Sequence, residues 1–137
     1  MAERRVDVFF YGLFMDSALL AEQQVQPVNP RHGHLDGFAL RIARRATLVP
    51  RSGARAYGVV FGLTHGELDR LYSAPGLEQY RPEPAMVQTL EGRAIPALCY
   101  TLPVEPPPEE HNPEYAARLR TVLTKLKFPT EYADSVA

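Results

Sequence analysis

Short runs of β-branched and aromatic residues recur along this chain, and most of them stop at a glycine or a proline. The run over residues 6–11 ends at Gly12, and the strongest run, over 56–63, ends at Thr64. Such runs predict short buried strands, because these side chains pack well on a pleated surface and the flanking residues interrupt the strand. Helical patterns separate some strands without a regular βαβ alternation. The pattern therefore predicts an α+β domain whose sheet curls on itself.

The other predicted elements are of the same kind. Further strands are predicted over 38–42, 46–50, 80–89 and 94–102, with turns at 51–53 and 90–93. Three helices are predicted. The first covers 16–24, and the second begins at the capping box of Thr64 and Glu67 and ends near residue 75. The third covers 115–126, where apolar residues share one face. The stretch 25–36 is rich in prolines and other breakers and is predicted to be a loop. The proline-rich stretch 103–113 is predicted to link the barrel to a C-terminal docking helix.

Length and charge restrict the classes of function. A chain of 137 residues has the size of one domain, so residues 1–137 are expected to share one core. Its 15 basic and 16 acidic side chains create no net field that would hold nucleic acid or an anionic membrane. The single cysteine, Cys99, and the lack of a long apolar run predict a soluble cytoplasmic protein. A small neutral or zwitterionic ligand fits this composition.

Three motifs follow one another along the chain. Tyr11 and Gly12 stand at the end of the first predicted strand, and Met15 follows them. The middle segment 35–68 contains the strongest strand and the capping box, and the tail contains Asn-Pro-Glu-Tyr at 112–115 and Phe-Pro-Thr-Glu-Tyr at 128–132. In this order the motifs resemble the gamma-glutamylcyclotransferase family and its avirulence-induced-gene-like relatives. The resemblance implies a small mixed β-barrel of about five or six strands with about two or three peripheral helices.

The resemblance also implies a site. In the family, backbone amides of the strand-to-loop turn hold the substrate, which corresponds here to Tyr11, Gly12, Leu13 and Phe14, and the tail motif places Tyr115 at the pocket. A glycine beside a strand end lets backbone donors converge, and the helix start that follows favours an anion. The implied ligand is a small gamma-glutamyl or amino-acid-like molecule, which the family cyclises to 5-oxoproline without a cofactor, releasing an amine.

The chain departs from the family at the catalytic position. Family members place a glutamate directly before a glycine, a few residues ahead of a tyrosine-arginine pair. Here Gly76 is followed by Tyr80 and Arg81, and the position before the glycine is Pro75, or Ala74 if the alignment slides by one residue. Cyclotransfer needs a group that takes a proton from the α-ammonium and returns one to the leaving nitrogen. Neither alanine nor proline can do this.

Two carboxylates are candidates to replace the glutamate. Glu78 lies in the same predicted loop, and Glu83 follows the start of the next strand. Two hypotheses therefore remain open: a cyclotransferase that uses Glu78 or Glu83, and a noncatalytic relative that binds the ligand as a sensor or accessory protein. A third is an interaction module that uses the arginines or the proline-rich segment. The oligomeric state is not predicted.

Two other groups of residues are interpreted as structural. His32 and His34 lack a third ligand at metal-site spacing, so they are expected to be solvated loop histidines and no metal is expected. Five arginines cluster in the strand region: Arg41, Arg44, Arg45, Arg51 and Arg55. They are interpreted as a solvated face, with binding of a phosphate or an acidic partner as the alternative.

Overall fold

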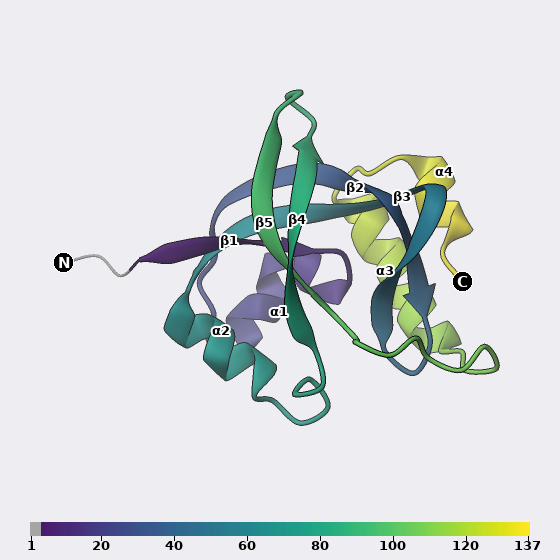
Figure 1. Ribbon diagram of the computed structural model, residues 1–137, viewed down its shortest axis with the longest axis horizontal. Coiled ribbons are helices and arrows are strands. Elements are labelled where there is room, and N and C mark those ends of the chain that lie inside the picture. Colours follow the sequence, from purple (N-terminus) through teal and green to yellow (C-terminus); the bar gives the residue numbers. More distant parts are fainter. Residues whose placement is uncertain (1–3) are drawn as a thin grey trace.

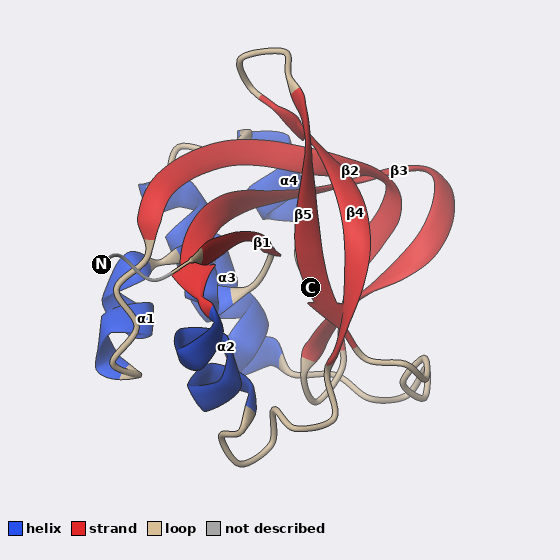
Figure 2. Ribbon diagram, turned by 60° about the vertical axis from the view of Figure 1, so that its left-hand side comes forward, coloured by secondary structure: helices blue, strands red, loops and turns tan. Residues whose placement is uncertain are grey.

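The computed structural model describes residues 4–137, and within them five strands close into a barrel in the order β1-β3-β2-β4-β5 (Figures 1 and 2). The strands are β1 (Arg5–Phe10), β2 (Val28–Ile42), β3 (Ala46–Thr64), β4 (Arg81–Thr89) and β5 (Ala94–Thr101). Paired strands are antiparallel except β1 and β5, which are parallel and close the barrel at Val8 and Leu98. The predicted α+β barrel is confirmed.

Four α-helices and a short 3-10 helix accompany the barrel in the described part of the chain. They are η1 (Leu13–Met15), α1 (Ser17–Glu22), α2 (His65–Tyr72), α3 (Pro113–Lys125) and α4 (Thr130–Ser135). At the start of α2 both hydrogen bonds of the capping box form: the Thr64 side chain accepts from Glu67 N at 3.1 Å, and Glu67 Oε1 accepts from Thr64 N at 2.9 Å. The sequence does not predict α4, because a proline such as Pro129 usually interrupts a helical pattern. Proline also fits a helix start, where no N–H is needed.

The prediction of a loop over residues 25–36 is wrong, because most of this stretch belongs to β2. Pro30 lies where the pairing with β3 shifts register, between Val28 and Arg31, and an irregular position tolerates a residue that cannot donate to the ladder. Gly33 lies where β2 pairs with β4, and a Cβ there would come 2.6 Å from the carbonyl oxygen of Gln88. Pro30 and Gly33 therefore lie within a strand, at positions where its pairing is irregular or closely packed.

The turn predicted at residues 51–53 is also wrong, because β3 continues through it. The pairing passes from Asp36 opposite Arg55 to Phe38 opposite Pro50, so the intervening residues of β3 form a bulge. Gly53 lies in this bulge with φ +81°, a conformation that a residue with a Cβ rarely adopts. The bulge explains why the sequence pattern indicated two strands there.

The core fills the barrel and the space beneath α3. Val8, Phe9 and Val60 are almost fully buried in the barrel, and Leu119 and Leu123 bury the apolar face of α3. Figure 1 shows α3 and α4 together beside the β2–β3 pair, with α1 and α2 below β1. None of the helices within residues 4–137 has the length and apolar character that crossing a bilayer requires.

Candidate functional site

A cavity of about 330 Å³ opens where β1 ends, between α1, α3 and the loop that follows α2. Half of the residues in its wall are aromatic, namely Phe9, Phe10, Tyr11, Phe14, Tyr72, Tyr80, Tyr100 and Tyr115. The other lining residues are Gly12, Leu13, Leu19, Glu22, Gln23, Ala46, Leu77 and Arg118. We call this cavity the phenol pocket. Its volume suits a small molecule.

The predicted turn Tyr11–Phe14 lines the phenol pocket together with Tyr115 from α3. The backbone of Gly12 is extended, with φ −112°, so glycine is not required there for a positive φ. It is required for space, because a Cβ at Gly12 would overlap the hydroxyl of Tyr115. That hydroxyl accepts a hydrogen bond from Leu13 N at 3.1 Å. The resemblance implies that Tyr115 lies at the pocket, and it does line the pocket, but its hydroxyl already binds Leu13 N, one of the backbone amides expected to hold the ligand.

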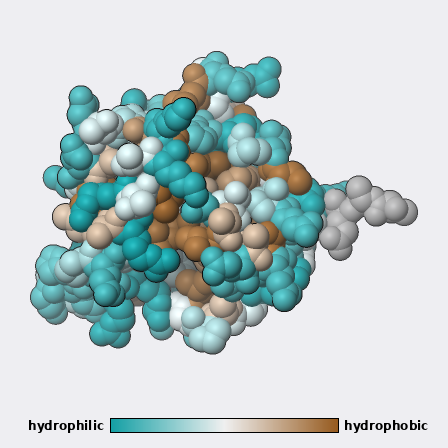
Figure 3. Space-filling model, turned by 180° about the vertical axis from the view of Figure 1, so that it is seen from behind, coloured by the Kyte–Doolittle hydropathy of each residue, from teal (hydrophilic) through white to brown (hydrophobic). Residues whose placement is uncertain are grey.

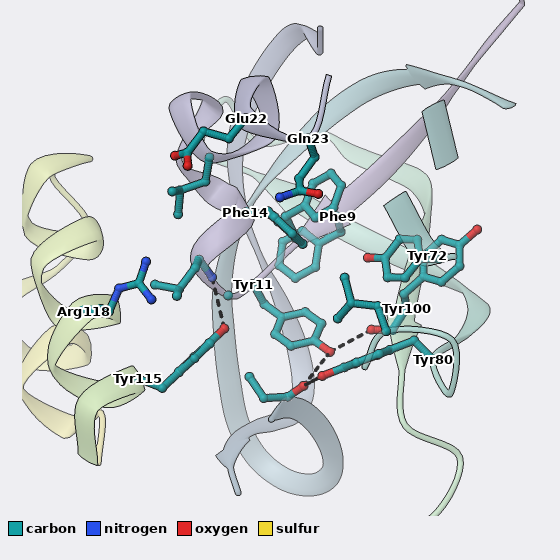
Figure 4. Close-up of a pocket in the computed structure, with 16 residues that line it drawn as sticks. Phe9, Tyr11, Phe14, Glu22, Gln23, Tyr72, Tyr80, Tyr100, Tyr115 and Arg118 are labelled. Carbon is teal, nitrogen blue, oxygen red and sulfur yellow. Dashed lines mark hydrogen bonds between the residues drawn. The ribbon is translucent and has the colours of Figure 1, made fainter. Parts of the chain in front are cut away.

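One side of the phenol pocket presents hydrogen-bond donors. Because Tyr115 Oη accepts from Leu13 N, its own proton is free to be donated. Arg118 lies three residues further along α3, on the same side of the helix, and lines the pocket as well. Figure 4 shows both side chains on the same side of the pocket. We call Tyr115 and Arg118 the donor end.

Another part of the lining presents acceptors. Tyr11 Oη donates to the carbonyl oxygen of Tyr100 at 2.7 Å, and Tyr80 Oη donates to the carbonyl oxygen of Ala46. Each hydroxyl has one proton, so both phenols direct only lone pairs at any other group that approaches. Figure 4 shows the two side chains converging, and both hydroxyls lie within hydrogen-bonding distance of the Ala46 carbonyl oxygen. We call Tyr11 and Tyr80 the acceptor end.

The phenols stay neutral near neutral pH. Burial raises the pKa of Tyr11 and Tyr72 well above the ordinary value, and burial also raises the pKa of Tyr80, Tyr100 and Tyr115. The rings of Tyr72 and Tyr100 stack with centroids 3.8 Å apart and planes at 8°. The phenols can therefore accept or donate hydrogen bonds in the pocket, but none supplies a phenolate that could act as a base.

The carboxylates proposed from sequence lie elsewhere. Glu78 and Glu83 are exposed, and neither is among the residues that line the phenol pocket. The one carboxylate in the lining is Glu22, at the end of α1. The sequence contained a signal for it, since Leu19, Glu22 and Gln23 have the spacing of one helix face in the helix that follows the Tyr11–Gly12 turn. Figure 4 places Glu22 and Gln23 together along one edge of the pocket.

His32 and His34 are strand residues, and their prediction as solvated loop histidines is wrong. The ring of His32 stacks on Phe128 with centroids 4.7 Å apart, and its burial lowers the pKa of the imidazole. His34 Nδ1 lies 2.9 Å from Asp36 Oδ1. In residues 4–137 no three His, Cys, Asp or Glu side chains are placed to share a metal ion.

On the face opposite to that in Figure 1, apolar atoms lie near the centre and hydrophilic side chains surround them (Figure 3).

The fold and the site together define a class of protein: a closed mixed barrel with an aromatic pocket beside a tyrosine-glycine turn. A family model for "Gamma-glutamyl cyclotransferase, AIG2-like" matches residues 8–118, so the chain belongs to that family.

Solved structures show the same fold. One described as a gamma-glutamyl cyclotransferase has a TM-score of 0.80 at 19% identity, covering 97% of this chain and 86% of its own. An uncharacterised human protein has a TM-score of 0.77 at 21% identity, covering 98% and 87%. An AIG2-like protein from Mus musculus has a TM-score of 0.62 at 19% identity, covering 82% and 91%. Comparison with curated protein sequences gave no match.

Proposed function

We propose that this protein binds a small gamma-glutamyl or amino-acid-like molecule in the phenol pocket and does not cyclise it. The carboxylate of the ligand is held at the donor end, by the free proton of Tyr115 and the charge of Arg118. Leu13 N–H donates to the same phenol at 3.1 Å and polarises it, which strengthens the bond that Tyr115 donates.

The α-ammonium of the ligand is held at the acceptor end. Lone pairs of Tyr11 and Tyr80 accept from it, because both hydroxyl protons are already donated to backbone carbonyls. The aromatic faces around them attract a cation as well. The acceptor end is the observation that carries the proposal, since its neutral phenols stabilise an ammonium group and neither of them is a base that could deprotonate it. A protonated amine cannot attack the γ-carbonyl, so the ligand stays uncyclised.

Calorimetric titration with gamma-glutamyl dipeptides and with two analogues tests this proposal, one analogue lacking the α-amino group and one lacking the α-carboxylate. We expect the parent compounds to bind and each analogue to bind about tenfold more weakly, because each loses one charged hydrogen-bonding group. Tyr115→Phe should weaken binding of the parent without affecting the analogue that lacks the carboxylate. Tyr57→Phe is the matched control, because Tyr57 lies outside the lining and packs on Tyr132. Equal binding of parent and analogues would overturn the ligand class.

Release of 5-oxoproline from the same compounds tests the absence of turnover. We expect no release above the uncatalysed rate. Measurable release by the wild-type protein would overturn the binding-only proposal while leaving the ligand class intact.

A second candidate function is cyclotransfer with Glu22 as the acid–base group, and its position in the pocket lining favours this. It predicts that Glu22→Gln lowers the release of 5-oxoproline at least roughly a hundredfold. The catalytic roles of Glu78 and Glu83 also remain predictions, and Glu78→Gln and Glu83→Gln belong in the same assay. Turnover that survives Glu22→Gln but is lost in one of these variants would reject Glu22 and identify the base.

A further inference from the structure

A second cavity lies on the other side of the loop between α2 and β4. Its volume is about 460 Å³, and three arginines line it: Arg44, Arg45 and Arg81. The loop separates the two cavities, because Leu77 and Tyr80 line the phenol pocket and Gln79 and Arg81 line the second cavity. We call the second cavity the arginine cleft. Its remaining wall is formed by Ala43, by residues 102–107 and by Glu110.

Hydrogen bonds hold the proline-rich wall of the arginine cleft against the turn between β2 and β3. Arg41 Nη2 donates to the carbonyl oxygens of Pro107 and Glu110, both at 2.9 Å. Asn112 Nδ2 donates to the carbonyl oxygen of Arg44 at 3.2 Å, and Arg44 N donates to Glu110 Oε1 at 3.3 Å. Both walls lie at the lower end of the barrel in Figures 1 and 2. The cleft is therefore formed before any ligand arrives.

The guanidinium groups of the cleft are free to bind an anion. Among residues 4–137, Arg44, Arg45 and Arg81 form no salt bridge. Arg81 Nη1 donates to the carbonyl oxygens of Glu78 and Tyr80, at 2.7 and 2.9 Å, and these bonds fix its orientation. Nε and Nη2 of Arg81 donate to no acceptor within residues 4–137.

Arg45 is the most constrained of the three. Its side chain is half-buried, and no acceptor for it is found in the described part of the chain. It lies against Gly76, where a Cβ would come 2.8 Å from Arg45 Nη2. Gly76 has φ +89°, so glycine serves both the turn and this close approach. A guanidinium that is partly shielded from water and lacks an acceptor attracts an oxyanion strongly.

Two carboxylates also border the cleft, Glu105 and Glu110. Glu110 is occupied as the acceptor of Arg44 N, and both lie on the proline-rich side, opposite the loop that contains Arg81. Three cations against two carboxylates leave an excess of positive charge. The charge excess and the free planar donors favour a ligand with several acceptor oxygens on one centre.

We propose that the arginine cleft binds the phosphate group of a small phosphorylated molecule. A phosphate group has three strong acceptor oxygens and a carboxylate has two, so a phosphate accepts more readily from several guanidinium groups at once. The cavity is larger than a phosphate, and Leu102, Pro103 and Val104 provide an apolar wall for the rest of the ligand. This site is separate from the phenol pocket, and its proposal does not depend on the function proposed for that pocket.

Nuclear magnetic resonance titration with inorganic pyrophosphate, at constant ionic strength, tests the proposal. We expect saturable shifts of the amides of residues 43–45 and 76–81. Arg45→Gln should weaken binding about tenfold, because it removes a charged donor. Arg93→Gln is the matched control: it removes the same charge from the exposed β4–β5 turn, which lines none of the cavities described, and should change affinity less than twofold.

Three results would overturn the proposal. Shifts that do not saturate, or an equal loss of affinity in Arg45→Gln and Arg93→Gln, would show diffuse electrostatic attraction in place of a site. If citrate binds more tightly than pyrophosphate, with the same dependence on Arg45, the ligand class of the arginine cleft is a polycarboxylate and not a phosphate. Arg44→Gln gives a second test of the cleft, should Arg45→Gln disturb the loop at Gly76.

Discussion

The hydroxyl of Tyr115 occupies the space that a Cβ on Gly12 would need, although Gly12 lies between β1 and η1 and Tyr115 lies in α3. This contact fixes α3 against the end of β1. It also allows Tyr115 Oη to accept from Leu13 N and to leave its own proton for a ligand.

Replacing Gly12 with alanine should therefore displace Tyr115. We expect the free energy of unfolding to fall by about 1–3 kcal/mol, because the added methyl group overpacks the contact. Ligand affinity should fall with it. Chemical denaturation and calorimetry measure the two effects. Gly66→Ala is the control, because a Cβ there meets nothing within 4 Å and alanine favours the α2 helix by about 0.5–1 kcal/mol. Unchanged stability in Gly12→Ala would contradict the contact.

Tyr80→Phe tests the acceptor end of the phenol pocket. The change removes the hydroxyl that donates to the Ala46 carbonyl and keeps the ring. We expect affinity for ligands with an α-ammonium to fall about tenfold, and affinity for the analogue without the amino group to stay unchanged. An equal loss for both ligands would indicate a change in pocket shape and would contradict the assigned role. Calorimetry on the same analogues makes the comparison.

Stability should depend on the charge of Glu67. Burial opposes its ionisation, but hydrogen bonds from Thr64 N and Gln26 N and the nearby Arg5 outweigh it and hold the pKa of Glu67 below its ordinary value. Because the pKa of Glu67 is lower in the folded protein, its carboxylate stabilises the fold at pH values above the ordinary carboxyl pKa. This contribution is lost as the pH falls through the pKa that Glu67 has in the folded protein. Glu67→Gln should cost about 1–2 kcal/mol at pH 7, because it replaces a charged acceptor by a neutral one.

The difference between wild type and Glu67→Gln should shrink at pH 3, where the carboxylate approaches protonation. Urea denaturation at the two pH values measures it. Glu91→Gln, in the exposed turn between β4 and β5, is the control and should differ little from wild type at either pH. A gap for Glu67→Gln that is as large at pH 3 as at pH 7 would reject the electrostatic explanation.

Cys99 should resist alkylation while the protein is folded. Cys99 is 2% exposed, and burial raises the pKa of its thiol to about 12. Because the thiolate is the reacting form, the native rate at pH 8 should be at least roughly a thousandfold below the rate in denaturing urea. A Cys99→Ser, Glu91→Cys double variant places the thiol on an exposed turn and should react at similar rates in both conditions. Rapid native labelling of Cys99 would show that β5 opens.

Some elements could be predicted because neighbouring residues determine them. The capping box of Thr64 and Glu67 lies within four consecutive residues, and both of its hydrogen bonds form. The hairpin of β4 and β5 likewise follows from a turn between two β-type runs. By contrast, Pro30 and Gly33 indicated a loop, and only pairing with β3 and β4 explains how a strand accommodates them.

The sequence by itself determined the α+β class, the Tyr11–Gly12 turn and the absence of a glutamate at Ala74 or Pro75, because these are properties of residue type and local order, whereas the barrel was implied by the family resemblance. Only the tertiary structure decided the chemistry of the pocket. Tyr11 donates to the carbonyl of a residue 89 positions away, and Tyr80 to one 34 positions away. Which end of the pocket accepts and which donates depends on these distant bonds, since a hydroxyl has one proton and the folded chain determines where it goes.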